Sequence, residues 1–164
     1  MILTGYHGTS TTNGHSIIAS KTFKYSNGPK EWLGKGIYFY ENITDAQQWV
    51  KDGQPSCVIS AIIKSSKKYI LDLDTDTGKS KFFEAIELFV KYNPNTPINK
   101  AQENQCAVCN LVHQLHPKYK LFMGSFAYNR TVLQTLTDAR PKRREMAVKD
   151  HSIIKSFEII KDKK

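Results

Sequence analysis

The chain has 164 residues, of which 40% are hydrophobic and 24% charged, an ordinary globular composition that argues against a disordered protein. The longest apolar run, Val58–Ile63 with one Ser inside it, is too short to cross a bilayer, and the first residues lack the features of a secretory signal. We therefore expect one cytoplasmic domain over residues 1–164 that makes no contact with a membrane. The 24 Lys and Arg residues against 15 Asp and Glu give a net charge of +9, which favours a polyanionic partner.

Hydrophobic periodicity and turn residues predict short strands at both ends of the chain and helices in its middle. The first half is predicted to contain a strand at Ile2–His7, a helix at about Asn13–Lys21, a loop at Tyr25–Lys35, a strand at Gly36–Tyr40, a short helix at Asp45–Lys51 and strands at Cys57–Lys64 and Lys68–Leu73. The second half is predicted to contain helices at Ser80–Tyr92 and about Lys100–His116, an ambiguous segment at Lys120–Phe126, a basic loop at Arg140–Arg144 and strands at Glu145–Lys149 and Ile153–Ile160. This order indicates an α+β domain with a largely antiparallel core.

Residues that often bind zinc recur along the second long helix, at Cys106, Cys109, His113 and His116. On a helix these four positions extend over roughly 15 Å at 1.5 Å per residue, whereas the ligands of one zinc ion all lie about 2.0–2.3 Å from the metal. The spacing therefore favours buried cysteines in the core, and we expect no metal site. Three cysteines without a secreted framework suit a reducing compartment.

Three separated motifs occur in an informative order along the chain. They are Tyr6-His7-Gly8-Thr9-Ser10, Trp32-Leu33-Gly34-Lys35-Gly36-Ile37-Tyr38-Phe39 and Arg144-Glu145-Met146-Ala147-Val148. Together they resemble the ADP-ribosyltransferase superfamily, on the branch shared by diphtheria toxin and the poly(ADP-ribose) polymerases, whose signature is His–Tyr–Glu. The resemblance implies split antiparallel β-sheets with flanking helices, NAD as co-substrate, and transfer of ADP-ribose after cleavage of the nicotinamide–ribose bond.

The resemblance also implies a pocket for NAD built from the first two motifs. Nicotinamide is a flat ring that carries an amide, so it needs aromatic faces and backbone partners. By the family pattern, the Gly8 backbone pairs with the carboxamide, Tyr38 stacks on the ring and Trp49 forms a second aromatic wall. The other implied NAD-binding residues are His7, at the adenosine-side ribose, with Thr9, Ser10 and Asn13.

Glu145 is the implied catalytic carboxylate, acting with His7 and Tyr38. It would hold the 2′-hydroxyl of the nicotinamide ribose, and its negative charge would stabilise the oxocarbenium-like transition state as nicotinamide leaves. Glu158 is the alternative, but it falls inside the last predicted strand rather than at the start of the strand before it. A glutamate at this third position, where relatives can carry glutamine, favours catalysis over passive binding.

The residues before Glu145 predict the class of acceptor. Arginine-modifying relatives place a second Glu or Gln two residues before the catalytic one, but Arg143 stands there and would repel a guanidinium. Lys and Arg instead favour an anionic acceptor, because they pair well with phosphate. The predicted acceptor-binding residues are Arg140, Lys142, Arg143 and Arg144. We therefore expect RNA or DNA as the acceptor.

Three other functions stay open at this point: modification of a protein, hydrolysis of NAD with water as the acceptor, and nucleic-acid binding without catalysis. A small transferase without accessory modules favours transfer of a single ADP-ribose over polymer synthesis. Because uncontrolled modification would harm the host, a toxin or defence effector restrained by an antitoxin protein is the accompanying hypothesis.

Overall fold

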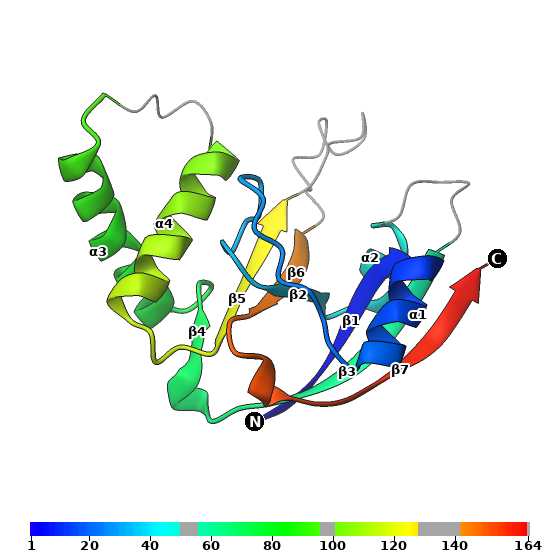
Figure 1. Ribbon diagram of the computed structural model, residues 1–164. Coiled ribbons are helices and arrows are strands. Elements are labelled where there is room, and N and C mark those ends of the chain that lie inside the picture. The colour runs from blue at the N-terminus through cyan, green and yellow to red at the C-terminus, as the bar shows by residue number, and fades with distance from the viewer. Residues whose placement is uncertain (50–55, 96–100, 128–141, 164) are drawn as a thin grey trace.

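The computed structural model describes residues 1–49, 56–95, 101–127 and 142–163 (Figure 1). The first half of the chain forms β1 (Ile2–Ser10), α1 (Thr11–Ser20), β2 (Ile37–Tyr40), α2 (Ile43–Gln47), β3 (Ser56–Lys64), the short 3-10 helix η1 (Lys67–Tyr69) and β4 (Ile70–Asp72). The second half forms α3 (Asp76–Tyr92), α4 (Ala101–Leu115), β5 (Leu121–Ala127), β6 (Lys142–Val148), the 3-10 helix η2 (His151–Ile153) and β7 (Ile154–Lys163). The predicted α+β class is confirmed.

Within the described residues the strands form one hydrogen-bonded sheet of seven, in the order β4-β5-β6-β2-β1-β3-β7. Of these seven strands only β4 and β5 pair in parallel, so the predicted antiparallel character is confirmed. The expected division into separate sheets is replaced by two halves of one sheet, which meet where Tyr6 of β1 pairs with Tyr40 of β2. The α3–α4 pair lies beside the β4–β5–β6 half, and α1 lies along the β1–β3–β7 half (Figure 1).

Capping side chains explain where two helices begin earlier than the sequence predicted. The Ser10 hydroxyl accepts a hydrogen bond from the Asn13 backbone N–H at 3.3 Å, so α1 begins at Thr11. The Thr75 hydroxyl likewise accepts from the Gly78 N–H at 3.1 Å, so α3 begins at Asp76. The ambiguous segment is strand β5, because its residues pair along β6.

The predicted basic loop is partly wrong, because β6 already begins at Lys142. This start fixes which side chains of β6 share a face, since successive residues of a strand point to opposite faces. Met146 and Val148 pack in one hydrophobic core, whereas Ala147 packs in the core on the other face. Glu145 is therefore on the face of Ala147, and Arg144 is on the face of Met146.

No helix in the described part of the chain is long and apolar enough to cross a bilayer.

Candidate functional site

A pocket of about 410 Å³ lies where β1, β2, β6 and the segment after α1 come together. Its lining consists of His7, Gly8, Thr9, Lys24, Ser26, Lys30, Glu31, Trp32, Tyr38, Tyr40, Trp49 and Glu145. The structure thus brings into one cavity the side chains or backbone of six residues singled out in the sequence, drawn from the three separated motifs and from Trp49.

Gly8 lets the strand β1 approach α2 closely. A Cβ atom at this position would overlap the carbonyl oxygen of Ala46, so any other residue would force the strand and the helix apart. The Trp49 backbone N–H bonds to that same carbonyl at 3.4 Å, which brings the Trp49 side chain to the pocket. This side chain is 58% exposed, and its ring centre lies 6.4 Å from that of Tyr40.

His7 is held by the next strand of the pocket. Its Nδ1 lies 2.8 Å from the carbonyl oxygen of Tyr38, and because a carbonyl only accepts, Nδ1 carries the proton and donates it. Burial lowers the pKa of His7, opposed by this hydrogen bond, so the neutral form is favoured. The neutral ring leaves Nε2 as a hydrogen-bond acceptor.

The Tyr38 hydroxyl fixes the turn in front of β2. It donates to the Gly34 carbonyl at 2.6 Å and accepts from the Leu33 backbone N–H at 3.0 Å. Gly34 has a φ of +72°, a conformation that glycine adopts most easily. Because the hydroxyl makes these two hydrogen bonds, Tyr38 contributes its aromatic ring to the pocket lining. The sequence predicted the ring but not the role of the hydroxyl.

Glu145 is the most unusual group of the pocket. Its strand position is opposite Tyr40 on one side and Gly124 on the other, and only 3% of the residue is exposed. Burial, followed by the negative charges of Glu31 and Asp45, raises the pKa of Glu145 to about 8. No ion pair joins this carboxylate to any residue that the structure describes. A buried carboxyl with a strongly raised pKa in a cavity is typical of a functional group.

Sequence reasoning missed the segment that closes the pocket on one side. Ser26 and Gly36 form an isolated bridge through two backbone hydrogen bonds of 2.8 and 3.1 Å, which draws the intervening residues over the cavity. The Ser26 hydroxyl donates to the Glu31 carboxylate, which lies in the lining with Glu145. A signal existed only for Tyr40, because it follows Tyr38 at the spacing that shares one face of a strand.

Lys149 supports the turn from the other side. Its buried ammonium donates to the carbonyl oxygens of Leu33 and Lys35, both at 2.6 Å, and lies 4.5 Å from the ring centre of Phe122. Burial lowers the pKa of Lys149 to about 8. No pattern in the sequence distinguished this lysine from the many others.

Two predicted NAD-binding residues do not reach the pocket. The Ser10 hydroxyl caps α1, and Asn13 is exposed on the first turn of that helix.

Cys106 and Cys109 of α4 are buried, as their helical spacing predicted. Their thiols face the carbonyl oxygens of Gly28 and Trp32 at 3.4 and 3.5 Å.

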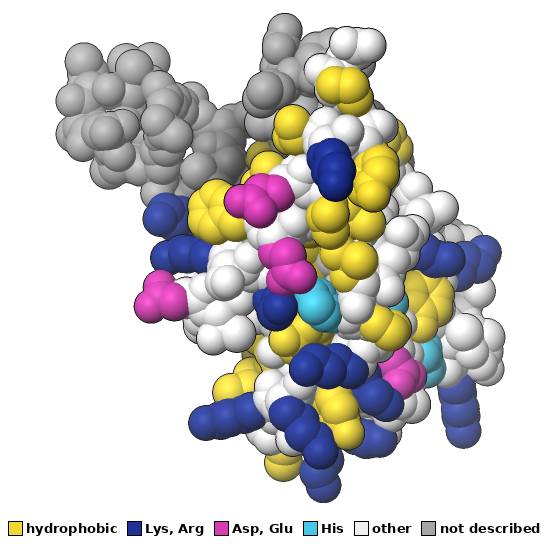
Figure 2. Space-filling view, turned by 90° about the vertical axis from the view of Figure 1, so that its left-hand side faces the viewer, with side chains coloured by type: hydrophobic (Ala, Val, Ile, Leu, Met, Phe, Trp, Pro, Cys, Tyr) yellow, Lys and Arg dark blue, Asp and Glu magenta, His cyan; other side chains and the backbone are white. Residues whose placement is uncertain are grey.

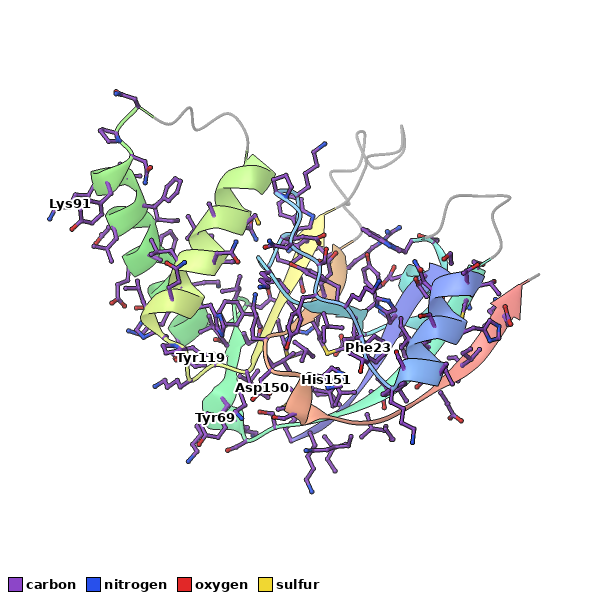
Figure 3. The ribbon with its side chains drawn as sticks, viewed as in Figure 1. Phe23, Tyr69, Lys91, Tyr119, Asp150 and His151 are labelled. Carbon is purple, nitrogen blue, oxygen red and sulfur yellow. The ribbon has the colours of Figure 1, made fainter. Side chains whose placement is uncertain are left out.

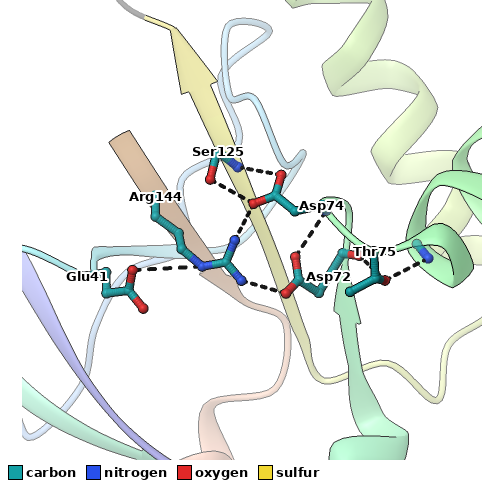
Figure 4. A network of polar contacts seen from close by, with 7 residues as sticks. Glu41, Asp72, Asp74, Thr75, Ser125 and Arg144 are labelled. Atoms are coloured by element: carbon teal, nitrogen blue, oxygen red, sulfur yellow. Dashed lines mark hydrogen bonds and ion pairs between the residues drawn. The ribbon is translucent and has the colours of Figure 1, made fainter. Parts of the chain in front are cut away.

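The predicted acceptor-binding residues have different surroundings. Arg144 lies on the opposite face of β6 from the pocket, where its guanidinium pairs with Asp72, Asp74 and Glu41 (Figure 4). The Asp74 carboxylate also accepts from the Ser125 hydroxyl and backbone N–H, so this group is fully engaged.

Two of the other predicted acceptor-binding residues are the first two residues of β6. Arg143 pairs through Nε with Asp45 at 3.2 Å and donates to the Gln48 side chain. Lys142 is exposed at the first position of the strand. Arg140 lies outside the described residues.

Comparison with known proteins gives one partial match. No family model matches the chain, and no solved structure matches it. An uncharacterized protein of Methanocaldococcus jannaschii is 44% identical over 48 residues, which are 29% of this chain and 22% of that protein. The matched segment is thus less than a quarter of the relative.

Proposed function

We propose that this chain is an NAD-dependent mono-ADP-ribosyltransferase of the ADP-ribosyltransferase-like fold, which transfers ADP-ribose to nucleic acid. The observation that carries the proposal is Glu145, a carboxyl group buried beside His7 and Tyr38 in one cavity. These are the three residues of the His–Tyr–Glu signature that the motifs suggested. A toxin or defence effector with an antitoxin partner remains the accompanying hypothesis.

The aromatic rings and charges of the pocket suit the nicotinamide and the pyrophosphate of NAD. The nicotinamide ring of NAD is a flat cation, and Tyr38, Tyr40 and Trp49 offer aromatic faces that attract such a cation. A positive ring beside Glu145 favours the ionised carboxylate, which the empty pocket disfavours. The pyrophosphate of NAD is anionic, and Lys24 and Lys30 supply positive charge in the same lining.

The proposed reaction breaks one bond and forms another. The bond between ribose C1′ and the nicotinamide nitrogen breaks, and its electron pair leaves with the ring as neutral nicotinamide. The Glu145 carboxylate stabilises the positive charge that develops on the ribose. A lone pair of the acceptor then forms the new bond to C1′, and the acceptor loses a proton to solvent. Neutral His7 accepts a hydrogen bond at Nε2 from a ribose hydroxyl, which orients the substrate.

The test uses NAD labelled on its adenylate phosphate, incubated with the protein and a cell extract that is then separated into RNA, DNA and protein. We expect label in RNA or DNA with the wild type and a loss of about 100-fold or more with Glu145→Gln. Glu158→Gln is the matched control, because Glu158 is exposed on β7 and does not line the pocket. Label in the protein fraction would mean that the acceptor is a protein rather than nucleic acid. Unchanged labelling by Glu145→Gln would refute the catalytic role of Glu145.

Hydrolysis of NAD is the second candidate function. It is favoured by the pairing of Arg143 and Arg144 with carboxylates, since both had been expected to hold the acceptor. The same experiment distinguishes it, because a hydrolase would release free ADP-ribose and label no macromolecule.

A further inference from the structure

Positive charge gathers on a surface separate from the pocket. This surface, here called the lysine surface, is made by the end of β3, by η1, by the turn after α4 and by the start of β7. Its lysines are Lys64, Lys67, Lys68, Lys118, Lys120 and Lys155. Residues 64–70, 117–121 and 149–155 contain a single carboxylate, that of Asp150. Figure 2 shows dark blue side chains gathered over the lower end of the molecule.

Backbone and ring contacts hold three of these lysines in place, namely Lys68, Lys118 and Lys120. The Lys120 backbone N–H donates to the Tyr69 carbonyl at 2.8 Å, which joins the turn after α4 to η1. Lys68 and Lys120 lie 4.9 and 5.8 Å from the ring centre of Tyr69, and Lys118 lies 5.3 Å from that of Tyr119. Both tyrosines lie at this end of the molecule, near Asp150 (Figure 3). The charges are therefore presented from a folded platform rather than from a flexible tail.

The lysine surface carries more uncompensated charge than the start of β6. Arg144 is surrounded by three carboxylates, and Arg143 pairs with Asp45. On the lysine surface only Lys120 makes a salt bridge, to Asp150 at 2.7 Å, among the residues that the structure describes. A polyanion is therefore attracted more strongly to the lysine surface than to Arg143 and Arg144.

We propose that the lysine surface binds the phosphodiester backbone of nucleic acid. The choice of nucleic acid over other polyanions rests on the proposed function. The positive charge of the surface is an observation that does not depend on that function. The surface is close enough to serve the same ligand as the pocket. Val148 ends β6 about 10 Å beyond Glu145 at 3.3 Å per residue, and Asp150, the partner of Lys120, follows almost directly. A short stretch of nucleic acid spans that distance.

The test measures binding of fluorescently labelled single-stranded RNA and DNA to the full chain without NAD, over a range of about 50 to 200 mM salt. The variant Lys68→Glu/Lys118→Glu changes two lysines of the surface. Its matched control, Lys79→Glu/Lys91→Glu, makes the same change in net charge at two exposed lysines of α3. We expect the surface variant to lose about tenfold or more in affinity and to show a shallower salt dependence, with little change in the control.

Two results would overturn the proposal. Equal losses in both variants would mean that net charge alone drives binding, and equal affinity for anionic lipid vesicles would mean that the surface does not select nucleic acid. Circular dichroism of both variants checks that they are folded. Because NAD is absent from this binding assay, a failure to bind RNA and DNA can be distinguished from a failure to transfer ADP-ribose. Comparing RNA with DNA shows which of the two nucleic acids the surface binds.

Discussion

The two faces of β6 differ in how their charged groups are balanced by neighbouring groups. On one face the Arg144 guanidinium is matched by Asp72, Asp74 and Glu41, so positive and negative groups balance. On the other face the neighbouring Glu145 is buried near two further carboxylates, and its pKa is raised by burial and by their charges. Adjacent residues of one strand therefore have different roles. The Arg144 face joins β6 to β4 and its following turn, whereas the Glu145 face keeps a carboxyl in a state that a cationic ligand can change.

The largest effect is expected from Glu145→Gln. The raised pKa means that the folded protein loses stability as the pH rises from the ordinary value of 4.5 to about 8. The loss reaches on the order of 4 kcal/mol at pH 8, at about 1.4 kcal/mol per pKa unit. We therefore expect Glu145→Gln to unfold at a higher temperature than the wild type at pH 8. Thermal unfolding at pH 5 and pH 8 measures this, and a difference that does not shrink at pH 5 would contradict it.

Lys149 offers a second buried charge, of opposite sign, next to the same strand. Its lowered pKa means that the folded protein gains stability as the pH rises from about 8 to the ordinary value of 10.5. The gain is on the order of 3 kcal/mol. Lys149→Met should lack this pH-dependent gain in stability. Lys64→Met, at an exposed position of β3, should keep the gain. Denaturant unfolding at pH 8 and pH 10 provides the measurement, and an identical rise in all three proteins would refute the cost of burying Lys149.

Arg144→Met tests the balanced face and should reduce stability. The loss at pH 7 is expected to be about 1–2 kcal/mol, because the ion pairs are partly exposed and therefore screened. Burial opposes the lowered pKa of Asp74, but hydrogen bonds from Ser125 and the charge of Arg144 outweigh it. The stability that depends on this carboxylate is present above its ordinary pKa of 3.8 and is lost as the pH falls further. Urea titrations from pH 7 to pH 3 should show the difference from wild type diminishing.

The smallest expected effect is the coupling between these neighbours. If the two faces are independent, the stability changes of Arg144→Met and Glu145→Gln add within about 0.5 kcal/mol in the double variant. A double-mutant cycle at pH 8 measures the coupling. A larger coupling would show that the ion pairs of Arg144 influence the carboxyl on the other face.

Much of the fold could be predicted from local patterns. A run of β-branched and other apolar residues located β3, and the helical spacing of Phe82, Ile86 and Phe89 located most of α3. The order of the motifs also led us to expect His7 and Glu145 in one place, although their roles in catalysis are still predictions. These features depend on residues close in sequence or on a resemblance that spans the separated motifs.

The surroundings of single side chains could not be predicted in the same way. Arg144 was expected in a loop with phosphate as partner, but two of its actual partners, Asp72 and Asp74, lie some seventy residues earlier in the chain. Glu31 lies in a segment whose path is set by one bridge, between Ser26 and Gly36. Nothing local to Arg144 encodes its pairing with Asp72 and Asp74, because that pairing depends on which strands become neighbours.

The position of β6 in the sheet has a consequence for protein synthesis. This strand lies between β5 and β2 and supplies Glu145 to the pocket, yet it is the sixth of the described strands to leave the ribosome. A nascent chain that has not reached residue 142 lacks both the strand that links β5 to β2 and the Glu145 side chain. Translation products that end before residue 142 therefore cannot carry the complete pocket, because its last lining residue is Glu145.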